Sequence, residues 1–266
     1  MREEILERAK KSTILGLEFK RNVIVRTVGG PREKARMDSG TTVLAFHFNK
    51  GILFAGDRRE MSGYWKISSQ RVVKVHKVAN FTGFCFAGSV SHGQLIKKAL
   101  TEINLQFFSK YGEDISIEGQ ANFIGDFCLE MSLGGSPLEV IFIIGGIDDS
   151  DCCIYELDAD GYRRQHGYIS VGSGSIEATT VLDGRRRSLT KGDLSKSNAV
   201  DLAMNALLRS GERDFGTSSP RLELPIMATI TRKGFDYVHS SSIAKSLKRL
   251  LRAEGINPKR GGKKKR

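Results

Sequence analysis

The residues with the clearest chemical potential are a threonine, an aspartate and a lysine in the first third of the chain. Gly40-Thr41 stands directly before an alternating apolar run at 43–48, Asp57 follows sixteen residues after the threonine, and Lys74 comes next. If the chain were cut after Gly40, Thr41 would carry a free α-amine beside its own hydroxyl. A nucleophile and its base would then lie in one residue. The pattern predicts a hydrolase that must be processed before it works.

Threonine alone is a poor nucleophile, because its hydroxyl stays almost fully protonated near neutral pH. Asp57 and Lys74 could help to activate it. A chain-terminal amine titrates near ~8 and is partly free base at neutral pH, unlike an ordinary lysine near ~10.4. A positive lysine nearby lowers the pKa of both the amine and the hydroxyl, and an aspartate would hold that lysine charged and oriented. Thr41, Asp57 and Lys74 would meet if the first strands pair side by side.

Each of these residues also has an ordinary structural interpretation. Thr41 would be a strand threonine, Asp57 a turn acid in a surface ion pair, and Lys74 an exposed strand lysine. The turn Gly172-Ser173-Gly174-Ser175 would be a strand-to-helix connection or a phosphate loop. Because no lysine follows it as a Walker motif requires, and GSGS does not match GxGxxG, nucleotide binding is disfavoured.

The hydrophobic period predicts a β-rich opening, two helices, more strands, two further helices and closing strands. Strands are expected at 41–49, 52–56, 70–78, 83–87, 140–144, 153–157, 226–231 and 235–238, with another leading to 172. Helices are expected at 3–11, 91–111, 117–133, from a serine cap near 175, at 197–210 and at 242–253. Two sheets with a helix pair over each outer face would bury both apolar sides. The predicted fold is therefore α+β, a four-layer α/β/β/α sandwich.

Composition sets limits on the function class. The chain has 266 residues, of which 39% are apolar, and no apolar run approaches the ~20 residues that span a bilayer. Its first residues lack the apolar region of a signal peptide, so a cytoplasmic protein is expected. The four cysteines and five histidines show no metal-ligand spacing and no HExxH. We therefore expect reduced thiols, no catalytic metal and no cofactor.

The net charge of +12 is concentrated at the two ends of the chain. Residues 1–40 carry +4 and residues 258–266 carry +6, which leaves +2 for the body. A nearly neutral body does not resemble a nucleic-acid-binding face. The basic end is expected to be a disordered tail with at most weak attraction for polyanions.

Taken together, these segments resemble the β subunit of the proteasome core particle, a family of the N-terminal nucleophile hydrolase superfamily, in its bacterial (actinobacterial-type) form. The resemblance runs from about residue 40 to about residue 251. Its best segments are GTTVLAFHFNKGILFAGDRR (40–59), SSQRVVKV (68–75), FAGSV (86–90), VGSGS (171–175) and RDFGTSS (213–219). Any one of them is weak, but their combination and order are specific.

The resemblance implies roles for individual residues. Thr41 aligns with the family's N-terminal threonine nucleophile, Asp57 with its aspartate and Lys74 with its lysine, after a one-residue insertion within 63–72. Gly88 aligns with the glycine whose backbone N–H serves as the oxyanion donor. Such a donor stabilises a tetrahedral intermediate by ~3–4 kcal/mol.

A second group of residues follows from the same alignment. Ser173 and Asp214 match the accessory serine and aspartate near the threonine amine. Thr217 stands where the family often has serine, and Ser218-Ser219 replaces its usual Gly-Gly, which puts the local turn geometry in question. The substrate pocket implied by the resemblance is lined by Glu60, Val72, Phe86 and Val90. Phe86 and Val90 favour an apolar preference, and Glu60 would admit some basic character.

The resemblance also implies how the chain matures and assembles. Residues 1–40 would be a propeptide, 41–253 the catalytic domain and 254–266 the basic tail. Thr41 would attack the Gly40 carbonyl, and an N-to-O acyl shift would release the propeptide. The product would be a threonine endopeptidase in seven-fold β rings stacked with α-subunit rings, supplied with unfolded chains by a ring ATPase. The alternatives are a non-catalytic structural β subunit, a subunit of the related two-ring bacterial protease, and a nucleic-acid-associated protein that uses the tail.

Overall fold

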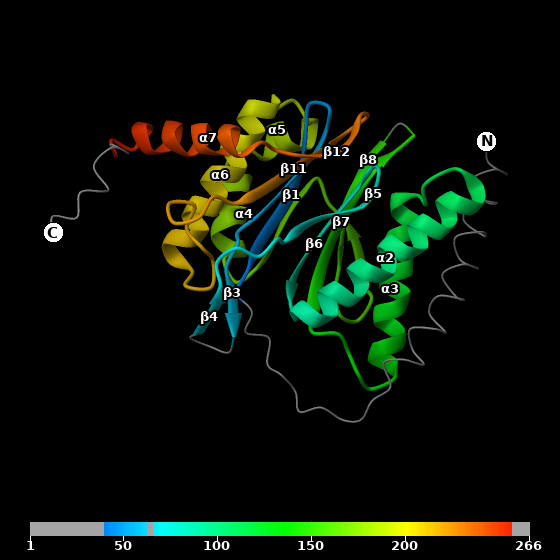
Figure 1. Ribbon diagram of the computed structural model, residues 1–266. Helices are drawn as coiled ribbons and strands as arrows, with labels where there is room; N and C mark the ends of the chain where they lie inside the picture. Colours follow the sequence, from blue (N-terminus) through cyan, green and yellow to red (C-terminus); the bar gives the residue numbers. More distant parts are fainter. Residues whose placement is uncertain (1–39, 63–65, 150, 257–266) are drawn as a thin grey trace.

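Two five-stranded antiparallel sheets lie face to face between two layers of helices (Figure 1). The computed structural model describes residues 40–62, 66–149 and 151–256. The first sheet has the order β10 (Tyr168–Gly172), β1 (Thr42–Phe48), β2 (Gly51–Gly56), β11 (Ile226–Thr231) and β12 (Gly234–Tyr237). The second has the order β5 (Val75–Ala79), β6 (Thr82–Gly88), β7 (Val140–Asp148), β8 (Asp151–Leu157) and β9 (Arg163–Gln165).

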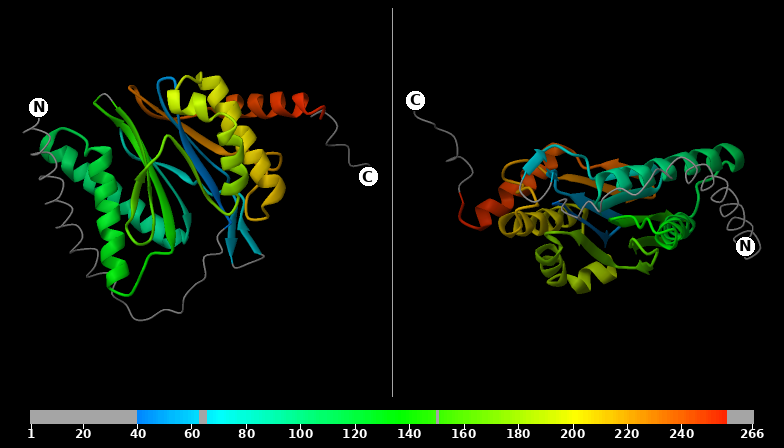
Figure 2. Two further views of the ribbon diagram at one scale, coloured as in Figure 1. Left: turned by 180° about the vertical axis from the view of Figure 1, so that it is seen from behind. Right: turned by 90° about the horizontal axis from the view of Figure 1, so that it is seen from below.

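The helices cover the outer faces of the two sheets, and the views in Figure 2 show the same layering from behind and from below. On the second sheet lie α2 (Val90–Tyr111) and α3 (Ile117–Leu133). The first sheet is covered by α4 (Ser175–Asp183), α5 (Arg186–Lys191) and α6 (Lys196–Arg213), and α7 (Ser240–Ala253) packs against α6. The predicted four-layer α+β sandwich is confirmed.

Three separate hydrophobic clusters fill the three spaces between the four layers. Strand β1 shows how the sequence divides between them. Leu44, Phe46 and Phe48 pack toward α4 and α6, whereas Val43 and Ala45 pack between the sheets. Successive side chains of a strand point to opposite faces, so a strand buried on both sides is apolar at almost every position.

Serine caps fix the starts of the long helices. Ser89, Ser116 and Ser195 each accept a hydrogen bond from a backbone N–H of the first turn. The serine cap expected near residue 175 was wrong, because Gly174 occupies that N-cap and makes no side-chain capping bond. A Cβ on Gly174 would lie 2.5 Å from the Thr42 hydroxyl oxygen. The glycine is therefore required by the close approach of α4 to the start of β1.

The structure corrects several predicted boundaries. The strand expected at 70–78 begins only at Val75, and residues 71–74 form an irregular connection to the second sheet. A two-stranded sheet of β3 (Glu60–Ser62) and β4 (Lys66–Ser69) precedes it, and this hairpin was not predicted. The short α5 was also missed. The helix expected at 3–11 and the tail at 258–266 lie outside the described residues.

None of the helices within the described ranges is both long and apolar enough to cross a membrane.

Candidate active site

Thr41 lies immediately before β1, between the ends of β2 and β10. Strand β1 pairs with both neighbours, with Thr42 opposite Gly172 and Val43 opposite Gly56. The backbone N–H of Ser173 donates to the Thr41 carbonyl at 2.8 Å. A Cβ on Gly172, whose φ is +108°, would lie only 2.0 Å from that carbonyl oxygen. A glycine at the end of β10 thus lets the two backbones close around the threonine.

Asp57 follows β2, and its carboxylate is fully occupied by donors. Its Oδ1 accepts from the backbone N–H of Thr42 at 2.8 Å and from the Lys74 Nζ at 2.7 Å. Its Oδ2 accepts from the backbone N–H groups of Arg59 at 2.8 Å and Ser218 at 3.0 Å. An ionised carboxylate accepts and never donates, so all four contacts match the charged form.

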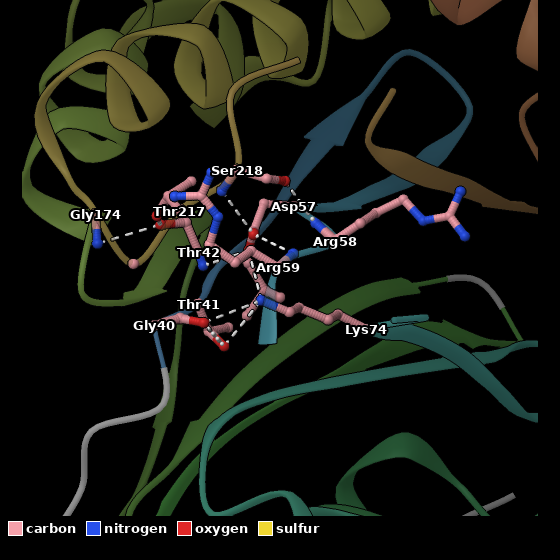
Figure 3. A network of polar contacts seen from close by, with 12 residues as sticks. Gly40, Thr41, Thr42, Asp57, Arg58, Arg59, Lys74, Gly174, Thr217 and Ser218 are labelled. Carbon is pink, nitrogen blue, oxygen red and sulfur yellow. Dashed lines mark hydrogen bonds and ion pairs between the residues drawn. The ribbon is translucent and has the colours of Figure 1, made fainter. Parts of the chain in front are cut away.

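Lys74 reaches the same point from the opposite sheet (Figure 3). Its Nζ lies 3.0 Å from the Thr41 hydroxyl oxygen and 3.3 Å from the Gly40 carbonyl oxygen. The expectation that neighbouring strands alone would bring the three residues together was incomplete. Thr41 and Asp57 flank the paired ends of β1 and β2 in the first sheet, but Lys74 precedes β5 of the second sheet.

Burial governs the charge state of Lys74. Only 7% of its side chain is exposed, and none of Asp57's. Burial lowers the pKa of the Lys74 ammonium from its ordinary value, and the Asp57 carboxylate partly offsets that effect. The lysine is therefore a stronger acid than a surface lysine while it remains fixed beside the threonine hydroxyl.

A second polar network holds the amide side of Thr41. The Ser173 hydroxyl donates to Asp214 Oδ2 at 2.6 Å and accepts from the Thr41 backbone N–H at 3.3 Å. The Thr217 hydroxyl donates to the same carboxylate oxygen at 2.5 Å. Since a hydroxyl carries one proton, Thr42, whose Oγ1 lies 2.5 Å from that of Thr217, is the donor in that pair.

The unusual Thr217-Ser218-Ser219 sequence supports both networks. Thr217 keeps the hydroxyl that contacts Asp214. The Ser218 backbone N–H donates to Asp57, and its hydroxyl accepts from the Arg58 backbone N–H at 3.1 Å. This segment therefore contacts Asp214 through the Thr217 hydroxyl and Asp57 through the Ser218 backbone.

A pocket of about 580 Å³ opens beside Thr41. Its lining includes the four residues predicted for the substrate pocket: Glu60, Val72, Phe86 and Val90. Gly88, at the end of β6, also lines it with a φ of +117°, and a Cβ there would lie 2.5 Å from the Glu139 carbonyl oxygen. The structure thus brings the predicted nucleophile, oxyanion donor and pocket residues to one cavity.

Two features of the pocket were not predicted. The His76 ring stacks on Phe86 with 5.9 Å between centroids, and the Phe86 ring lies directly over Gly93 of α2. Burial, with a smaller contribution from Lys97, lowers the pKa of His76 to about 4. The lining also carries several cations: Arg59, Lys74, Lys77, Lys97 and Lys98. His76 and the lysines of α2 lie outside the sequence segments that suggested the site. Their spacing along the chain matches no catalytic or binding motif.

Further supporting contacts were missed although their residues lie within the segments that suggested the site. The Arg59 guanidinium donates to the Phe215 carbonyl and lies 5.7 Å from the Phe215 ring centre. Gly216 packs against Gly40, which only the folded chain reveals. Within the described residues, no three His, Cys, Asp or Glu side chains are grouped so that they could hold a metal ion.

Comparison with known proteins gives consistent matches over most of the chain. The sequence profile of the family described as "Proteasome subunit" matches residues 37–223. A relative named proteasome subunit beta from Methanobrevibacter ruminantium is 30% identical over 204 residues, which are 77% of this chain and 92% of that one. Proteins of the same name from Streptomyces griseus and Frankia casuarinae are each 31% identical. These matches cover 81% and 78% of this chain, and 79% and 76% of the respective relatives.

Proposed function

The chain belongs to the proteasome subunit family as a β subunit, and from this premise we propose that it is a threonine endopeptidase that activates itself. Thr41 is the proposed nucleophile, Lys74 and Asp57 set its protonation, and residues 1–40 are a propeptide. The observation that carries the proposal is the position of Lys74 Nζ, within hydrogen-bond reach of Asp57, the Thr41 hydroxyl and the Gly40 carbonyl.

Self-release must proceed without an α-amine, because the Thr41 nitrogen is still an amide. In the proposed step the Thr41 Oγ1 attacks the Gly40 carbonyl carbon, and its proton passes to Lys74, whose lowered pKa makes the neutral amine more accessible. The Gly40–Thr41 C–N bond breaks, the nitrogen takes the proton, and an ester to Oγ1 remains. Water hydrolyses that ester, which frees residues 1–40 and the Thr41 amine.

Peptide hydrolysis then uses the new amine, held at the Ser173 hydroxyl, as the base. It accepts the Thr41 hydroxyl proton, directly or through a water, as Oγ1 attacks a substrate carbonyl. Gly88 N–H is the proposed donor to the oxyanion. The acyl-enzyme ester is hydrolysed by water. Asp214, Ser173 and Thr217 are positioning residues in this scheme, because their network orients the amine rather than the substrate.

The proposed setting follows from the family. The chain would assemble into β rings stacked with α-subunit rings in the cytoplasm, and a ring ATPase or another regulator would supply unfolded proteins. A non-catalytic subunit is less well supported, because Thr41, Asp57 and Lys74 are all present and in contact. The apolar parts of the pocket favour substrates with an apolar residue before the cut bond.

The test is peptide hydrolysis by the chain assembled with its α subunit. The wild type should hydrolyse a fluorogenic peptide that has an apolar residue before the cut bond, and Thr41→Ala should not. A particle of the same size in both samples, measured by gel filtration, shows that loss of activity is not loss of assembly. An assembled Thr41→Ala particle with wild-type activity would refute the proposal.

A further inference from the structure

Two glycines from distant parts of the chain meet backbone to backbone at the predicted cleavage point. A Cβ on Gly40 would lie 2.2 Å from the Gly216 Cα, and a Cβ on Gly216 would lie 2.5 Å from the Gly40 Cα. Gly216 belongs to the turn that follows α6, so this contact joins the last residue before Thr41 to the loop that carries Asp214. Neither position has room for a side chain.

We propose that Gly216 is a positioning residue for the release of residues 1–40. Its bare backbone is the surface on which Gly40 lies, and this keeps the Gly40 carbonyl beside the Thr41 hydroxyl. A side chain at 216 would displace the bond that has to be cut. The inference rests on the proposed function. It gives Gly216 a role in the release of residues 1–40, although Gly216 would not touch the reacting atoms.

The turn around Gly216 is fixed and offers little relief from such a clash. The Gly216 backbone N–H donates to Asp214 Oδ1 at 3.0 Å, and the Thr217 N–H donates to the Asp214 carbonyl at 3.3 Å. The Phe215 carbonyl accepts from the guanidinium of Arg59, which is itself buried. Retreat of the turn would break these bonds and disturb the carboxylate that holds Ser173 and Thr217.

Retreat of Gly40 would have a direct chemical cost. Its carbonyl oxygen accepts from the Thr41 hydroxyl at 2.8 Å and from Lys74 at 3.3 Å. Displacement from Gly216 moves this carbonyl away from the nucleophile and the cation together. Misplacement of reacting groups by ~1 Å can reduce a rate by about 10²-fold.

After release the same substitution meets a different environment. With Gly40 gone, a Cβ on Gly216 would have Ser173 Oγ at 2.8 Å and Asp214 Oδ1 at 3.4 Å as its nearest neighbours. Both are ends of side chains, which move more readily than backbone. Because they hold the amine in the proposed scheme, their movement should slow hydrolysis, but to a smaller extent. A methyl group at 216 should therefore slow propeptide release much more than it slows peptide hydrolysis.

The experiment compares three full-length variants with the wild type, each assembled with the α subunit. Gly216→Ala and Gly40→Ala place a methyl group on opposite sides of the contact. Gly167→Ala is the control, because a Cβ there meets nothing within 4 Å. Intact mass followed over time measures release of residues 1–40. We expect release to slow by at least about tenfold in the first two variants and to stay at the wild-type rate in the control.

Two further measurements separate positioning from folding. Leader-free chains that begin at Thr41 give the hydrolysis rate of Gly216→Ala, and its loss relative to wild type should be at least about tenfold smaller than its loss in release. Gly40→Ala leaves a mature product of wild-type sequence, so any slow release it shows comes from the precursor alone.

The outcomes distinguish this inference from the proposed function. Release by Gly216→Ala at the wild-type rate, or equal losses in release and hydrolysis, would overturn the inference and leave the proposed function standing. Retention of residues 1–40 by the assembled wild type would overturn the proposed function, and the inference with it.

Discussion

The ammonium group of Lys74 lies 3.0 Å from the hydroxyl of Thr41, although Thr41 precedes β1 of the first sheet and Lys74 precedes β5 of the second. Asp57, which follows β2 of the first sheet, holds the ammonium at 2.7 Å. The packing of one sheet on the other therefore brings the site residues together. Substitutions that disturb this packing should lower catalytic activity.

Removing the lysine should stop both proposed reactions. We expect Lys74→Ala to lose at least about 10³-fold in release, which loses its proton acceptor, and in hydrolysis, which loses the charge that lowers the pKa of the Thr41 amine and hydroxyl. Lys74→Arg keeps a cation but not a group that can accept a proton, so it should still fail to release residues 1–40. Lys66→Ala, on an exposed lysine of β4 that does not line the pocket, is the control. Lys74→Ala activity within tenfold of wild type would refute this role.

Asp57→Asn should destabilise the fold as well as the site. The amide offers one acceptor oxygen in place of two, so at least one pair of donors would face an NH₂ group. Breaking a buried ion pair costs about 3–5 kcal/mol. Denaturant unfolding should therefore show a loss of this order, and Asp236→Asn, at an exposed position, should show almost none. Equal stability of the two variants would contradict the buried carboxylate's role.

His76 should make the stability of the fold pH-dependent in a defined window. Its pKa is lowered from 6.5 to about 4, so between these values the unfolded chain binds a proton that the folded chain does not. Stability should fall as the pH drops from 6.5 toward 4 and lose nothing further through this group below 4. His76→Gln should flatten that part of the curve, as measured by denaturant unfolding at several pH values. An unchanged slope would argue against a half-buried histidine that is neutral in the folded chain.

Glu60 should set how well the pocket accepts basic side chains. Its carboxylate lines the cavity beside Phe86 and Val90, among several lysines. Glu60→Gln should lower kcat/KM about tenfold for peptides with a basic residue before the cut bond, and change it little for apolar ones. Glu102→Gln, which removes a charge elsewhere in the same lining, serves as the comparison. Equal effects on both peptide classes would show that Glu60 does not select.

Local pattern predicted most of the elements, and the four-layer arrangement followed from their order. The same local pattern predicted that Asp57 lies near Thr41, because β1 and β2 are joined by a short turn and pair with each other. It did not show that Lys74 crosses from the other sheet, since the irregular stretch 71–74 has a strand-like composition. The contact between Gly40 and Gly216 depends on the position of the turn after α6 in the folded chain. Such positions are fixed by tertiary packing and leave no periodic signal in the sequence.

The most direct test of self-activation is the intact mass of the assembled wild type beside that of Thr41→Ala. The wild type should lose residues 1–40 and begin at Thr41, while the variant keeps them. Loss of residues 1–40 from both particles would show that another protease cuts the chain. Retention by the assembled wild type would show that Thr41 never becomes a terminal nucleophile, which contradicts the account.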